Sequence, residues 1–144
     1  MTKAFSLLEL IIAILIISII AAFIASKYTG LLSSANTTKL KADVALIRNG
    51  ISTLKQEKIL LQDYSTINSL DNEPVQTKNS KLFSKVINKP LISTTRVLKE
   101  DGKWFKDSSS KYGYFISTNE LIIFKYENSQ FNCIEPLSIC QELF

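Results

Sequence analysis

The residue types that most often carry out chemistry in proteins are scarce in this sequence. It contains no histidine, and therefore lacks the commonest general base and the commonest metal ligand. Ser108–Ser110 are possible nucleophiles, but no base lies near them in the sequence. Neither of the common glycine-rich phosphate-binding motifs occurs in a chain that holds only four glycines. The sequence therefore predicts no catalytic residue, no cofactor and no enzymatic activity.

One short acidic segment has residue types that calcium uses. Leu70–Glu73, with the sequence LDNE, offers two carboxylates and one amide oxygen. The segment lacks the ligand spacing of a defined calcium loop, so no metal site is predicted from it. Whether calcium binds there stays an open question at this level.

The two cysteines lie close together near the C-terminus. Cys133 and Cys140 enclose the sequence IEPLSI, which is not the C-x-x-C spacing of redox-active pairs. In the cytosol they would remain thiols, but outside it the loop containing Pro136 can bring them together as a disulfide. Closing so short a loop is worth about 2.5 kcal/mol by chain entropy. We predict a structural disulfide.

A single carboxylate stands at the start of a long apolar run, TKAFSLLELIIAILIISIIAAF. Leu10–Ser26 comprises seventeen residues without a charge, proline or glycine, which predicts one continuous apolar helix. With Phe5–Glu9 added, this helix reaches the length of a membrane span. A charge within a bilayer costs on the order of 3 kcal/mol, so Glu9 needs an explanation.

Two ordinary membrane-targeting explanations fit only in part. A secretory signal peptide would use Lys3 as its basic start, but the far end of the run has no A-x-A cleavage spacing. A plain signal-anchor fits the length, and Glu9 would then lie at the membrane interface with its carboxylate directed outward. That alternative gives Glu9 no purpose.

The stretch KAFSLLEL resembles the prepilin motif of type IV pilins and type II secretion pseudopilins. In that family a short basic leader ends in a small residue, usually glycine, and a phenylalanine becomes the new N-terminus. Here Ala4 holds the small position and Phe5 follows it. Ser6–Leu8 match the next positions, and Glu9 falls at the fifth position of the mature chain. Ser26 stands where many major pilins carry a proline.

The resemblance implies that residues 1–4 form a leader, which is cleaved between Ala4 and Phe5, and that Phe5 is N-methylated. It implies a membrane-spanning and filament-core helix over residues 5–26 and a periplasmic head over 27–144. Glu9 would pair with the amine of Phe5 on a neighbouring subunit and fix the register of assembly. The implied partners are copies of the chain, other pilins or pseudopilins, a prepilin peptidase and an assembly platform of the bacterial inner membrane.

The spacing of apolar residues predicts that the helix continues past the apolar run. Apolar residues recur at steps of three and four, which gives one apolar helix face: Leu40, Val44, Ile47, Ile51 and Leu54. Gly30 and Gly50 should each weaken this helix by up to about 1 kcal/mol, with a bend near Gly30. The apolar face should pack on the head, although a partner helix in a coiled coil is the alternative.

The remainder of the chain predicts a small antiparallel sheet, so the fold class is α+β. Residues 68–90 read as a surface loop, with a helical turn at Leu82–Ile87. Asp101–Gly102 should form a hairpin turn between strands over 92–98 and 103–105, and a second hairpin should join 112–117 to 120–126. A last short strand is expected over 130–134. The expected core residues of the sheet are Trp104, Tyr114, Phe115, Ile122 and Phe124.

The pilin resemblance leaves the biological role open between secretion, pilus formation and DNA uptake. The net charge of +4 is compatible with a nucleic-acid partner, and Lys103, Lys106 and Lys111 are the candidate DNA-contacting residues of a competence pilin. A signal-anchored periplasmic protein that never assembles is the other alternative. The sequence favours a structural subunit of a pilin-like filament, held in the bacterial inner membrane by a single helix before it assembles.

Overall fold

The computed structural model describes the backbone of residues 7–144 and the side chains of residues 7–23 and 33–144. The chain divides into two compact units, residues 1–35 and residues 36–144. We call residues 36–144 the head unit. It combines helix with a small antiparallel sheet, so the α+β class predicted from the sequence is confirmed.

Helix α1 extends over Leu7–Leu60 and begins in the first unit and ends in the head unit. Its backbone remains helical through Gly30. Within the apolar run, the hydroxyl of Ser18 donates a hydrogen bond to the carbonyl of Ile14 (2.7 Å), so this polar group is satisfied inside the helix. None of the helices in the described part of the chain has both the length and the apolar character required to cross a membrane.

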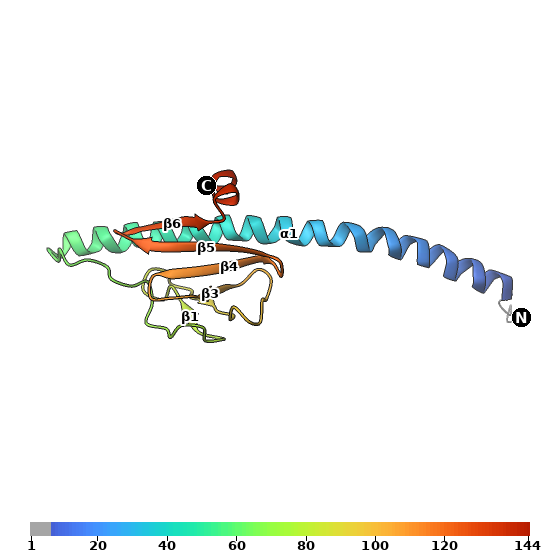
Figure 1. Ribbon diagram of the computed structural model, residues 1–144, viewed down its shortest axis with the longest axis horizontal. Helices are drawn as coiled ribbons and strands as arrows, with labels where there is room; N and C mark the ends of the chain where they lie inside the picture. The colour runs from blue at the N-terminus through green and yellow to red at the C-terminus, as the bar shows by residue number, and fades with distance from the viewer. Residues whose placement is uncertain (1–6) are drawn as a thin grey trace, which may run out of the picture. The chain divides into compact units, whose positions relative to one another are not determined.

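The head unit contains a four-stranded antiparallel sheet in the order β3-β4-β5-β6, and Figure 1 shows these strands side by side. A two-stranded sheet, β1-β2, and a short C-terminal helix complete the unit. The elements are β1 Lys81–Leu82, β2 Leu91–Ile92, β3 Trp104–Lys106, β4 Lys111–Ser117, β5 Glu120–Glu127, β6 Gln130–Glu135 and α2 Leu137–Leu143.

The second predicted hairpin and the last predicted strand are confirmed as β4, β5 and β6. The first predicted hairpin is wrong. Gly102 does lie in a turn, with φ of +70°, but its N–H donates to the carbonyl of Phe115 in β4 (2.7 Å). The strand predicted over 92–98 is reduced to β2, which pairs with β1, while β3 pairs with β4. The turn signal at Asp101–Gly102 was correct, but the strands on its two sides were paired with the wrong partners.

The segment predicted as a surface loop over residues 68–90 supplies part of the core. Leu70, Leu82 and Phe83 are fully buried. The helical turn predicted over Leu82–Ile87 is a turn in which the N–H of Ile87 donates to the carbonyl of Phe83 (3.0 Å), and Leu82 belongs to β1. The polar composition of this segment concealed the few apolar side chains that anchor it.

The apolar face of α1 is buried against the sheet of the same chain, as predicted. Leu40, Val44, Ile47 and Ile51 are at most 4% exposed, and Leu54 is half-buried. The four buried residues belong to one core cluster with the buried aromatic rings of the sheet: Trp104, Tyr112, Tyr114, Phe124 and Phe131. A coiled-coil partner is therefore not needed to cover this face.

Burial raises the pKa of the Tyr112 and Tyr114 hydroxyls well above the usual value, because it disfavours the charged phenolate.

Gly50 has a packing role that the helix propensity scale does not capture. A Cβ atom at this position would lie 1.9 Å from the carbonyl oxygen of Val86. Only glycine therefore lets the turn before β2 approach α1 this closely.

Phe115 is buried as predicted, but on the other face of the sheet. It packs with Phe105 and Ile123 in a separate cluster, and the rings of Phe105 and Phe115 stack with centroids 5.2 Å apart. Its neighbours Tyr114 and Ile116 belong to the core cluster that contains the α1 residues. Successive side chains of a strand point to opposite faces of the sheet. Because apolar residues occupy both sets of positions in β4, both faces of this strand are apolar.

A buried ion pair joins β3 to the segment between α1 and β1. The ammonium of Lys106 lies 2.6 Å from Oδ1 of Asp71, and the two side chains are only 7% and 0% exposed. Lys106 also donates to the backbone carbonyl of Glu73 (2.8 Å), whose N–H donates to Asp71 (3.2 Å). The second carboxylate oxygen of Asp71 accepts from the hydroxyl of Tyr112 (3.0 Å) and the N–H of Phe83 (3.1 Å). Both oxygens of this carboxylate are therefore satisfied by the protein itself.

Replacing Lys106 by methionine should lower the free energy of unfolding of the head unit by about 3–5 kcal/mol, because Asp71 would remain buried without its countercharge. Urea unfolding followed by the fluorescence of Trp104, the single tryptophan of the chain, measures this loss. The matched control is Lys125→Met, which removes an exposed pair with Glu127 and should cost less than about 1 kcal/mol. Equal losses in the two variants would contradict a structural role for the buried pair.

Candidate functional site

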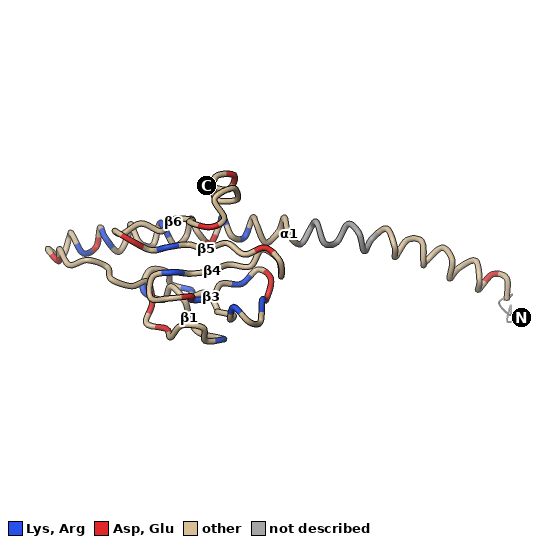
Figure 2. Tube along the Cα trace, viewed as in Figure 1, with Lys and Arg blue, Asp and Glu red and all other residues tan. Residues whose placement is uncertain are grey.

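The first candidate surface is the N-terminal part of α1. The side chains of residues 7–23 are all exposed, including Leu7 (78%) and Phe23 (72%). Glu9 is the single charged residue in this range (Figure 2) and lies in the first turn of α1. A carboxylate near the start of a helix interacts favourably with the helix dipole. Apart from Glu9 and Ser18, the described side chains of this surface are all apolar, which is typical of a helix that other apolar groups must cover.

The predicted processing residues Ala4 and Phe5 lie outside the described residues. The predicted filament-core segment 5–26 likewise includes positions at both ends whose side chains the structure does not describe. Glu9 is thus the one described member of the assembly residues predicted from the sequence.

The predicted disulfide between Cys133 and Cys140 is confirmed, and their Cα atoms lie 5.5 Å apart. It fastens α2 to the end of β6. Beyond α2, the ring of Phe144 contacts the ring of Phe124 edge-on, with centroids 5.6 Å apart. The disulfide therefore holds a short helix that could not persist alone at seven residues.

The three lysines proposed to contact DNA do not form one free basic patch. Lys106 is buried in its pair with Asp71, and Lys103 pairs with Glu100 (2.5 Å). The ammonium groups of Lys103 and Lys78 lower the pKa of the Glu100 carboxyl to about 2. Lys111 is half-buried at the start of β4. The structure thus gives no support to a DNA-contacting role for this set.

The acidic segment Leu70–Glu73 does not form a cation site. Leu70 is buried in the core, and both oxygens of Asp71 are used by Lys106, Tyr112 and backbone N–H groups. Among the residues that the structure describes, no three potential metal ligands gather in one place.

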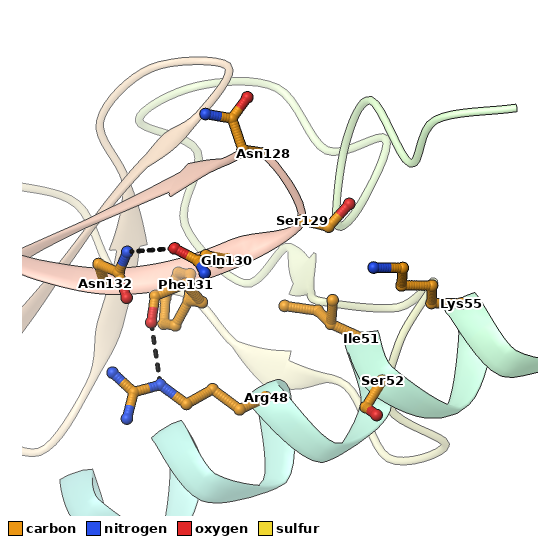
Figure 3. Close-up of a pocket in the computed structure, with 9 residues that line it drawn as sticks. All are labelled: Arg48, Ile51, Ser52, Lys55, Asn128, Ser129, Gln130, Phe131 and Asn132. Atoms are coloured by element: carbon orange, nitrogen blue, oxygen red, sulfur yellow. Dashed lines mark hydrogen bonds between the residues drawn. The ribbon is translucent and has the colours of Figure 1, made fainter.

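The sequence did not predict a groove between α1 and the β5–β6 hairpin, drawn in Figure 3. Its volume is about 420 Å³. Arg48 and Lys55 line it from α1, and residues 128–132 line it from the hairpin. The seven-residue spacing of Arg48 and Lys55 was visible in the sequence and places them on similar sides of a helix. Nothing in the sequence indicated that β6 would lie beside them.

Comparison of this chain with protein-family models, with curated proteins and with solved structures found no match.

Removing the disulfide by changing Cys133 and Cys140 together to serine should lower the free energy of unfolding of the head unit by about 2.5 kcal/mol, the entropy of closing the short loop. Urea unfolding measures the difference. As a control, a reductant should destabilise the original protein by a similar amount and leave the serine variant unchanged. An unchanged unfolding midpoint in the double variant would show that α2 is held by packing alone.

Proposed function

We propose that this chain is a structural subunit of a pilin-like filament, of the type II secretion pseudopilus or type IV pilus class. The observation that carries the proposal is the position of Glu9. It is the single charge among the exposed residues 7–23 of α1 and is the fifth residue after the Ala4–Phe5 bond, where the prepilin motif has its glutamate.

The apolar side chains of residues 7–23 support this proposal because they need an apolar environment that the helix itself does not supply. In a bundle of identical helices each copy covers the others, so the exposed Leu and Ile side chains become buried. A carboxylate is tolerated within such a bundle only when it is paired. The new amino group that cleavage would create on Phe5 of a neighbouring copy is a suitable partner for Glu9.

The disulfide supports a location of the head unit outside the cytoplasm. Disulfides persist in oxidising compartments such as the bacterial periplasm and are rare in the cytosol. In the proposed life cycle, a prepilin peptidase removes residues 1–4 and the inner membrane holds the subunit through the helix over residues 5–26. The assembly platform then transfers it to the filament, where its partners are copies of itself and other pilins or pseudopilins.

Processing is the first step to test. When the full chain is produced together with a prepilin peptidase, the membrane-associated protein should begin at Phe5. Its mass should be lower by residues 1–4 and higher by one methyl group. Intact mass measurement and analysis of the N-terminal peptide check this. A chain that still begins at Met1 in the presence of active peptidase would instead favour the non-assembling signal-anchored protein.

Replacing Glu9 by leucine should reduce the amount of subunit in sheared filaments at least about tenfold, a loss equivalent to 1.4 kcal/mol or more of pairing free energy. The level in the membrane fraction should not fall, because leucine is more apolar than glutamate. Glu57→Leu is the matched control, since Glu57 is an exposed acid of the same helix within the head unit. Normal incorporation of the Glu9→Leu subunit would contradict the assembly role of Glu9.

A further inference from the structure

The groove between α1 and the β5–β6 hairpin has the charge and hydrogen-bonding groups of a binding site. Among the residues that the structure describes, its charged lining residues are Arg48 and Lys55, and none of its lining residues is an aspartate or glutamate. Gln130 and Asn132 are among the polar residues that line it from the hairpin. All of these residues belong to the head unit.

Arg48 is held in place before any ligand arrives. Its Nε donates to the carbonyl of Phe131 (2.9 Å), and its guanidinium carbon lies 5.3 Å from the centre of the Phe144 ring. It forms no ion pair with any residue in the described part of the chain. The two terminal nitrogens therefore remain as donors, and a planar guanidinium in a fixed position is well suited to bind a carboxylate.

Lys55 supplies the second cation of the groove. It is exposed, has no ion pair among the described residues, and extends from α1 toward Ser129 at the tip of the hairpin (Figure 3). Arg48 and Lys55 are seven residues apart on one helix, which corresponds to about 10.5 Å along its axis. This is the spacing of the two helix positions from which the long side chains of both cations extend.

The hairpin side of the groove can hydrogen-bond to a polar chain. Gln130 and Asn132 are exposed and two residues apart on β6, so they project from the same face of the strand. The amide nitrogen of Asn132 donates weakly to the side-chain oxygen of Gln130 (3.3 Å), which leaves both side chains with further donors and acceptors. Such amides match the peptide groups of an extended segment.

We infer that this groove binds an extended acidic segment of a protein partner, with two carboxylates three residues apart. Three residues of extended chain span about 10 Å, which is close to the axial spacing of positions 48 and 55 on α1. Single-stranded nucleic acid fits less well, because it requires exposed aromatic rings on which bases stack. Of the described residues that line this groove, only Phe131 has an aromatic ring, and it is 1% exposed. The inference goes beyond the proposed filament role and does not rest on it.

The test uses the full chain in detergent micelles and a fluorescent peptide with two glutamates separated by two glycines. Binding is followed by fluorescence anisotropy at low salt. Lys55→Gln should weaken binding about three- to fivefold, the effect of one exposed ion pair. Lys41→Gln is the matched control, because Lys41 is an exposed lysine of α1 within the head unit but does not line the groove, and it should leave binding unchanged.

Two further probes separate this inference from general attraction to negative charge. A peptide with the two glutamates adjacent keeps the charge but loses the spacing, and it should bind more weakly than the spaced peptide. An oligothymidylate of equal charge should also bind more weakly. The inference is overturned if the spaced peptide does not bind, if either probe binds as tightly, or if Lys41→Gln weakens binding as much as Lys55→Gln.

Discussion

The buried ion pair between Lys106 and Asp71 is the interaction on which the arrangement of the head unit depends. Asp71 lies in a segment with little regular backbone hydrogen bonding, so side-chain bonds must fix its position. Through one carboxylate it connects β3, β4 and the start of the Phe83 turn, because Lys106, Tyr112 and the N–H of Phe83 all donate to it. A buried charge is stable only with all its partners present, and this makes the network cooperative. The same pair removes Lys106 and Asp71 from the residues available for nucleic acid or cations.

Sequence reasoning succeeded where the determining contacts are local. The apolar face of α1 follows from a period near 3.6, and the β4–β5 hairpin follows from two β-rich segments joined by two turn residues. It failed where the pairing of strands depends on residues far apart in the sequence. A turn at Gly102 shows that the chain reverses but not which strands pair, and β3 found its partner in β4. The burial of Asp71 depends on Lys106 and Tyr112, which are 35 and 41 residues away.

The candidate sites divide in the same way. The spacing of Cys133 and Cys140 contained the information for the disulfide, because a loop this short brings the two residues together once oxidation is possible. The sequence contained no such information about the groove. Arg48 and Phe131 are 83 residues apart in the sequence. Arg48 and Lys55 line a groove only because β6 lies beside α1. Glu9 was identified by its contrast with its neighbours, which is again a local property.

The two candidate surfaces differ in the physics of what they can bind. The N-terminal part of α1 offers an apolar surface with one carboxylate, and association there would be driven by burial of apolar area, which salt does not weaken. The groove of the head unit offers two cations in contact with solvent, and attraction there is screened within a Debye length of about 8 Å at physiological ionic strength. A partner held by the groove would therefore exchange readily under conditions in which packed helices remain associated. The proposed assembly and the proposed recognition of a partner would therefore use different parts of this chain, one apolar and one cationic.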